Sequence, residues 1–174
     1  MFQGSPNLAR RIVGRAAIAC LAASLLAPAP ARANSLSEGE RAYARQDYAR
    51  AAALLSREAE KGRATAQAYL GYMYSYGLGL PQDYIEAARW LRRAADQGEP
   101  TAQYLLGLAY DKGHGVKQDF VEAEALLDLA VAHADARRRD GWTVIRNAVK
   151  NKLTRAELRE AQDRALAFTL TPER

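Results

Sequence analysis

The chain has 174 residues, which suits about one domain, and its formal net charge at neutral pH is +5. Four of its 25 basic side chains and none of its 20 acidic ones lie in residues 1–33, so the rest of the chain is almost neutral. A near-neutral chain gives no electrostatic argument for nucleic acid as a partner. The only cysteine, Cys20, also lies in this first segment, so residues 34–174 can contain no disulfide, thiol nucleophile or cysteine metal site.

Residues 1–33 have the pattern of a secretory signal peptide. Three arginines form a charged start, an apolar run at 16–27 follows, and Ala31-Arg32-Ala33 matches a small-residue cleavage site. The apolar run is too short for a comfortable transmembrane helix. We therefore expect cleavage after Ala33 and a periplasmic or secreted mature protein without stable membrane insertion. The alternative is an uncleaved amphipathic anchor.

The remainder of the chain repeats itself with a period of 36 residues. Residues 65–94 align without a gap on 101–130, with 14 of 30 positions identical, and 47–62 align on 83–98 with 8 of 16 identical. Upstream of residue 47 the match needs a gap of roughly five residues, which predicts a shorter turn in the first unit. The predicted organisation is a first repeat at 34–63, two regular repeats at 64–99 and 100–135, and a tail at 136–174.

Each repeat is expected to be an antiparallel pair of helices. In the middle repeat, apolar residues recur at helical spacing first around Leu70 and again around Leu91. Asp83, followed by Glu86, is typical of a helix N-terminus, and Gly98 suits the left-handed residue after a helix end. Asp119 with Glu122, and Gly62, repeat these signals in the neighbouring units.

The tail is predicted to form two further helices. Residues 134–152 have a helical pattern with a break near Gly141. Residues 153–170 begin with Thr154 and Glu157 in the spacing of a capping box, and an apolar stripe follows. We expect a terminal helix pair that seals the open end of the repeat stack, because terminal units must cover themselves with polar surface.

The two regular repeats resemble the Sel1-like family, a tetratricopeptide-like solenoid with repeats of about 36 residues. In the first copy the resemblance is carried by Ala66, Leu70, Gly71, Tyr74, Gly77, Gly79, Asp83, Ala87, Trp90, Ala94, Ala95 and Gly98. In the second it is carried by Ala102, Leu106, Gly107, Tyr110, Gly113, Gly115, Asp119, Ala123 and Ala130. The second copy departs from the pattern at Leu126, Val131 and Ala134, which suggests that the stack ends there, and the first unit is closer to a plain tetratricopeptide repeat. The resemblance implies an all-α fold, a short right-handed solenoid of antiparallel helical hairpins, and a scaffold that binds proteins.

No arrangement of residues predicts an enzyme. The two histidines, His114 in a turn and His133 near a helix end, are too few for a metal site. Gly77 and Gly79 follow a predicted helix and precede Leu80-Pro81, which does not fit a phosphate-binding loop. The arginines at 137–139 are expected to be a solvated surface rather than a nucleic-acid patch. We therefore expect no catalytic residue, metal, cofactor or nucleic acid.

Four residues of one predicted first helix, Tyr69, Tyr72, Met73 and Tyr76, differ from the next repeat. Their counterparts 36 residues later are Leu105, Leu108, Ala109 and Lys112. The spacing i, i+3, i+4, i+7 puts the four on one side of the helix. First helices line the concave surface of tetratricopeptide-like solenoids, and tyrosine suits a binding surface because it is large, stiff and amphipathic. One hypothesis is that these four residues and Lys112 form a protein-binding face; the alternative is that the tyrosines pack against neighbouring repeats.

These observations favour an exported, non-enzymatic adaptor that holds a protein or peptide at the bacterial cell envelope. Two alternatives stay open: a protein that binds or hydrolyses the envelope polymer peptidoglycan, and a structural subunit of an envelope complex. The repeat pattern does not decide between them, because fold and function are separable.

Overall fold

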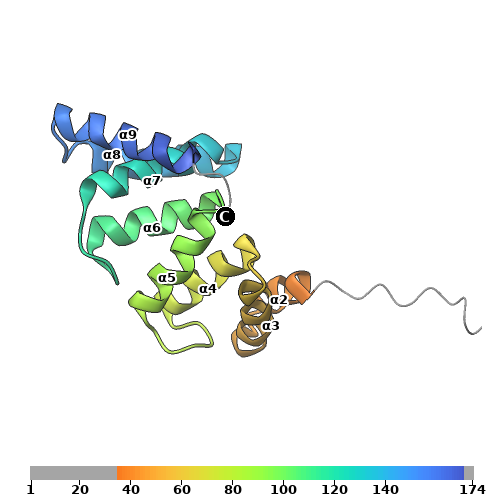
Figure 1. Ribbon diagram of the computed structural model, residues 1–174. Helices are drawn as coiled ribbons and strands as arrows, with labels where there is room; N and C mark the ends of the chain where they lie inside the picture. The colour runs from red at the N-terminus through yellow and green to blue at the C-terminus, as the bar shows by residue number, and fades with distance from the viewer. Residues whose placement is uncertain (1–34, 171–174) are drawn as a thin grey trace, which may run out of the picture. The chain divides into compact units, whose positions relative to one another are not determined.

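The computed structural model describes residues 35–170, so the expected signal peptide at 1–33 lies outside the described residues. All regular secondary structure from 35 to 170 is helical, and these residues belong to one compact unit. Eight helices follow one another in this unit (Figure 1). They are α2 (Ser35–Ala44), α3 (Tyr48–Glu60), α4 (Ala64–Tyr76), α5 (Tyr84–Ala95), α6 (Pro100–Lys112), α7 (Phe120–His133), α8 (Ala136–Lys150) and α9 (Arg155–Leu170).

The helices pack as consecutive pairs. Helix α2 packs on α3, α4 on α5 and α6 on α7, and the second helix of each pair also packs on the first helix of the next pair. The core between them is built largely from alanine and leucine, with Ala66, Leu70 and Leu106 almost fully buried. The predicted all-α class and the hairpin repeat are thus confirmed. In the described residues no helix is both long and apolar enough to cross a membrane.

One glycine in each first helix allows the two helices of a hairpin to cross closely. A Cβ added to any of these glycines would lie within 2.5–2.9 Å of a leucine side chain on the second helix. The pairs are Gly39 with Leu55, Gly71 with Leu91, and Gly107 with Leu127. The partners are 20 residues apart in the two regular hairpins and 16 apart in the first. The first turn is therefore four residues shorter, close to the gap that the sequence alignment requires.

The Gly-x-Gly turns connect the two helices of each regular hairpin and contact the preceding hairpin. Gly77 ends α4 in the left-handed conformation, and its N–H donates to the carbonyl oxygen of Met73. Gly79 lies so close to the start of α3 that a Cβ on it would be 2.4 Å from the carbonyl group of Tyr48. A Cβ on Gly115 would be 1.9 Å from the carbonyl oxygen of Tyr84, at the start of α5. The second glycine of each turn is needed for this close approach of two backbones, which leaves no room there for a phosphate.

The predicted helix starts are present. Asp83 accepts hydrogen bonds from the N–H groups of Ile85 and Glu86, and Asp119 makes the equivalent pair at α7. At α9, Thr154 and Glu157 bond reciprocally in a complete capping box. These caps depend only on residues a few positions apart, which is why the sequence predicts them well.

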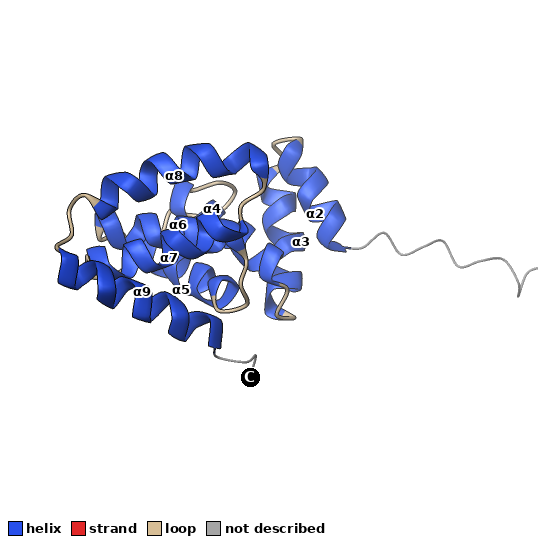
Figure 2. Cartoon of the chain, turned by 90° about the horizontal axis from the view of Figure 1, so that it is seen from above, coloured by secondary structure: helices blue, strands red, loops and turns tan. Residues whose placement is uncertain are grey.

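The C-terminal helices differ from the prediction in two respects. Helix α8 runs without a break through Gly141. The side of α8 at Gly141 is open, so the glycine imposes no close contact that would require a bend. Helices α8 and α9 both pack on α7, on either side of it, rather than forming a hairpin with each other (Figure 2). Helix α8 occupies the place of a next first helix, whereas α9 covers the outer side of α7.

Candidate binding surface on the first helices

Four tyrosine rings from α2 and α4 form a continuous surface, which we name the tyrosine face: Tyr43, Tyr69, Tyr72 and Tyr76. The ring of Tyr43 meets that of Tyr69 edge-on at 5.1 Å between centroids and that of Tyr72 at 6.3 Å. Tyr72 and Tyr76 lie 4.5 Å apart with an interplanar angle of 36°. The three predicted tyrosines are therefore brought together, and Tyr43 joins them from the preceding hairpin.

Burial divides the tyrosine face into a packed part and an open part. Tyr43 and Tyr69 are half-buried and pack against the core of the first two hairpins. Tyr72 is half-buried, and Tyr76 is 58% exposed. One edge of the surface therefore packs on the neighbouring hairpin, whereas the other edge remains accessible to solvent.

Met73 does not lie on this surface, although the sequence analysis placed it there. Its side chain is fully buried in the core beside Ala66 and Leu70. On a helix of 3.6 residues per turn, position 73 points between the directions of Tyr69 and Leu70. In the packed hairpin this side of α4 faces the core. We therefore remove Met73 from the candidate binding residues.

A pocket of about 420 Å³ opens between α2, α4, the start of α6 and the start of α8. We name it the tyrosine pocket. Its walls include three rings and three charged side chains: Tyr43, Tyr69, Tyr72, Glu40, Glu99 and Arg138. The residues come from four different helices, so the pocket exists only because the hairpins stack.

A second pocket, of about 250 Å³, lies at the other end of the tyrosine face between α4, α5 and α6. Tyr76 and Lys112 both line it, as do Tyr84 and His114, whose rings stack at 4.5 Å. Its floor is apolar, with Leu91 among the lining residues. Lys112 forms an ion pair of 3.0 Å with Asp111 but stays largely exposed. The predicted residues Tyr76 and Lys112 therefore share one pocket even though they lie on different helices.

Two phenols of the tyrosine face, Tyr43 and Tyr69, have a raised pKa. Burial, and then the neighbouring phenols of Tyr72 and Tyr48, raise the pKa of Tyr43 to about 12. Burial also raises the pKa of Tyr69, and the carboxylates of Glu40 and Glu99 act in the same direction while Arg138 opposes them. At neutral pH, Tyr43 and Tyr69 therefore offer aromatic rings and protonated hydroxyl groups.

Several residues of this surface escaped the sequence analysis. Tyr104 of α6 stacks on Trp142 of α8 at 4.6 Å and 9°, which fixes the start of α8 beside the tyrosine pocket. Glu40 could have been predicted from the sequence. It directly follows Gly39, the glycine at which α2 crosses α3, just as Tyr72 directly follows Gly71 in the next hairpin. Arg138 gave no signal, since its place depends on how α8 packs.

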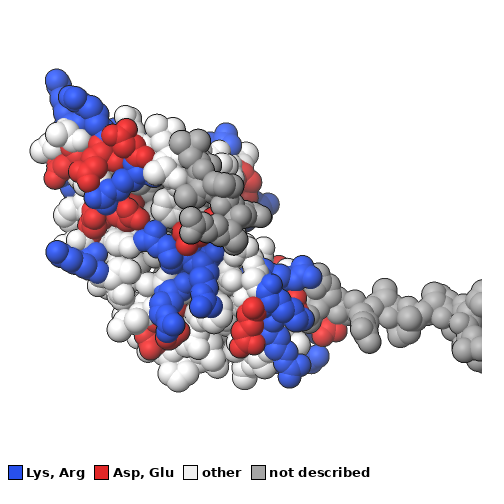
Figure 3. Space-filling model, in the orientation of Figure 1, with Lys and Arg blue, Asp and Glu red and all other residues white. Residues whose placement is uncertain are grey.

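The other candidate residues have ordinary structural roles. Arg138 bonds to the Thr101 hydroxyl oxygen at 2.8 Å, and Arg139 donates to the carbonyl oxygen of Ala134. Among the described residues no cluster of three or more potential metal ligands occurs. On the face drawn in Figure 3, basic and acidic side chains are interspersed rather than gathered by sign. Nothing on that face resembles a phosphate-binding stripe.

The two regular hairpins match a known repeat. Residues 64–99 and 100–135 each match the sequence model of the Sel1 repeat. The chain therefore carries two tandem repeats of the Sel1 repeat family. In this family the fold generally mediates interactions between proteins.

Two crystal structures show the same arrangement in other Sel1 repeat proteins. One is a protective antigen present in uropathogenic Escherichia coli strains, described as displaying an SLR fold; its TM-score is 0.71 at 28% identity. The other is a Sel1 repeat protein from Oxalobacter formigenes, with a TM-score of 0.57 at 32% identity. The matches cover 80% and 61% of this chain but only 33% and 42% of those proteins, which are therefore much longer chains. No curated protein matches the sequence.

Proposed function

We propose that this Sel1 repeat protein is an exported, non-enzymatic adaptor that holds a protein or peptide on its tyrosine face at the bacterial cell envelope. The export signal expected at 1–33 supports the location, and the Sel1 repeats support a protein partner. The tyrosine face supplies the binding surface. Catalysis is not part of the proposal, since burial raises the pKa of the Tyr43 and Tyr69 phenols on this surface.

The exposure of Tyr76 is the observation that carries this proposal. A tyrosine that served only to stabilise the stack would be buried, yet Tyr76 is 58% exposed and lines the second pocket beside Tyr72, which lines the tyrosine pocket. Aromatic rings between pockets are typical of the residues that dominate protein interfaces, because they bury a large area with few rotatable bonds.

A photo-crosslinking amino acid at position 76 tests the proposal in living cells. We expect one dominant crosslinked protein from position 76. The matched control places the same amino acid at Arg89, an exposed residue on the second helix of the same hairpin. The same products from both positions, or none from position 76, would contradict the proposed face.

Two further measurements address the alternative functions. Labelled peptidoglycan fragments that bind the purified protein without any partner protein would favour the envelope polymer as the ligand. A structural subunit would be indicated if Tyr72→Ala left the complex that is crosslinked through position 76 intact.

A further inference from the structure

The tyrosine pocket has the shape of a partial aromatic cage. Tyr43 meets Tyr69 at an interplanar angle of 63° and Tyr72 at 77°, so neighbouring walls of the pocket are close to perpendicular. All three rings are half-buried, which leaves part of each open to the pocket. Rings in this arrangement present their negative faces to a shared volume, and a cation is attracted there.

The charges around the same pocket are unequal. Glu40 and Glu99 both line it, and Arg138 is the only basic residue in its walls. The guanidinium of Arg138 is already paired, at 3.1 Å from Asp135 and 2.8 Å from the Thr101 hydroxyl oxygen. Glu40 forms no ion pair with any residue that the structure describes. The carboxylate of Glu40 therefore lies beside three tyrosine rings without an ion-pair partner among the described residues.

We propose that the tyrosine pocket receives the lysine or arginine side chain of the bound protein segment, an inference that rests on the proposed function. The rings would contact the cationic head, and Glu40 would pair with it. An anionic group would meet two carboxylates, and a purely apolar side chain would bury Glu40 without compensation.

The state of Tyr69 agrees with a negative potential in the pocket. Both carboxylates contribute to the raised pKa of its phenol, after burial, and Arg138 only partly opposes them. A cation brought into this space would be stabilised by the same field. Because the pocket is open to solvent, its attraction for a cation should weaken with rising salt.

The remaining part of the partner has a defined path. Tyr72 and Tyr76 are 4.5 Å apart and connect the tyrosine pocket to the second pocket with its apolar floor. A segment with a basic residue in the first pocket would place neighbouring residues over Tyr76. The structure thus assigns charge recognition to one pocket and apolar contact to the other.

Selection of random peptides displayed on phage, against protein produced from the full chain, tests this division. We expect the selected peptides to share a lysine or arginine at one position. Replacing that residue by norleucine, which is of similar length but uncharged, should weaken binding about tenfold. In the Glu40→Gln variant the same replacement should have much less effect, because the carboxylate that recognises the charge is gone.

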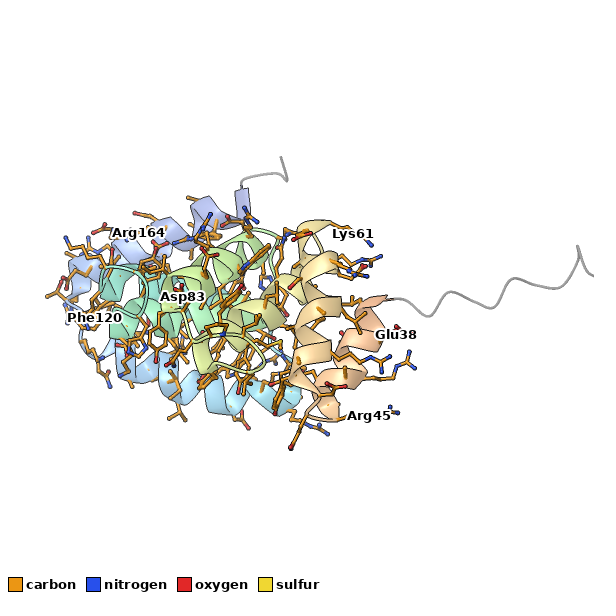
Figure 4. All side chains as sticks on the ribbon, turned by 90° about the horizontal axis from the view of Figure 1, so that it is seen from below. Glu38, Arg45, Lys61, Asp83, Phe120 and Arg164 are labelled. Atoms are coloured by element: carbon orange, nitrogen blue, oxygen red, sulfur yellow. The ribbon has the colours of Figure 1, made fainter. Side chains whose placement is uncertain are left out.

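Glu38→Gln is the matched control variant. It removes the same charge from the same helix, but Glu38 lines a different pocket together with Arg41 and Arg45 (Figure 4). In this variant the tenfold effect of norleucine should persist. Equal behaviour of the Glu38→Gln and Glu40→Gln variants would overturn the assignment of the pocket.

The outcomes separate this inference from the proposed function. Peptides that bind the tyrosine face without a fixed basic residue would refute the cation pocket and leave the adaptor function standing. A selection that yields no specific peptide would refute both. Self-association of the protein that Glu40→Gln abolishes would assign the pocket to a second copy of the chain and overturn the inference.

Discussion

Substitution of Gly115 by alanine should destabilise the stack more than the same substitution at a turn glycine with open surroundings. Gly115 has a φ of +72°, and an added Cβ would lie 1.9 Å from the carbonyl oxygen of Tyr84. That oxygen belongs to backbone at the start of α5, which cannot rotate away as a side chain would. The turn and the helix start must therefore separate.

The magnitude follows from comparison with Gly98. At Gly98 φ is +78° and no atom lies within 4 Å of an added Cβ, so alanine there introduces only left-handed backbone strain, about 1 kcal/mol. Gly115→Ala carries the same strain and also displaces packed backbone, for which overpacking costs of about 1–3 kcal/mol are typical. We expect a loss of about 3 kcal/mol for Gly115→Ala and about 1 kcal/mol for Gly98→Ala.

Urea unfolding followed by far-ultraviolet circular dichroism measures both losses. The free energy of unfolding should fall while the dependence on urea concentration stays unchanged, because the folded and unfolded states expose the same surface as before. Equal losses in the two variants would show that the close approach to Tyr84 does not hold the hairpins together. The second glycine of each Gly-x-Gly turn would then not be required for the stacking of the hairpins.

Three further predictions concern stability, pH and export. Tyr76→Ala should change the free energy of unfolding by less than about 0.5 kcal/mol, whereas Tyr69→Ala should lower it by about 2 kcal/mol, because only Tyr69 packs on the core. Equal losses of the two variants in urea unfolding would contradict the division of the tyrosine face into a packed part and an open part. Burial, and then Asp128, raise the pKa of Glu124 to about 7 from 4.5, so its stabilising contribution is complete below about pH 4.5 and is lost as the pH rises through 7. The loss is on the order of 3 kcal/mol, and Glu124→Gln should flatten the stability profile between about pH 4.5 and 7; parallel profiles of the two proteins would exclude this role. N-terminal sequencing of the protein from a periplasmic fraction should begin at Asn34, and an intact N-terminus in the cytoplasm would refute export.

The sequence by itself determined the repeat unit and its local geometry. The glycines that end helices, the aspartate caps and the capping box of α9 could be predicted because each acts on backbone within a few residues. The 36-residue period was visible because stacked hairpins must present the same contacts to each neighbour, which keeps the same residue types at the same positions. The side of α4 that carries the tyrosines followed from helical spacing alone.

Only the tertiary structure decided which side chains share a site. Spacing could not separate Met73 from Tyr72, because the border between core and surface on α4 is set by the helices that pack against it. The tail was predicted as a terminal helix pair, but only the structure shows that α8 and α9 each pack on α7 rather than on each other. Glu40, Tyr69 and Arg138 are distant in the chain and meet in one pocket only after the hairpins stack. The binding chemistry therefore depends on long-range packing that no local pattern encodes.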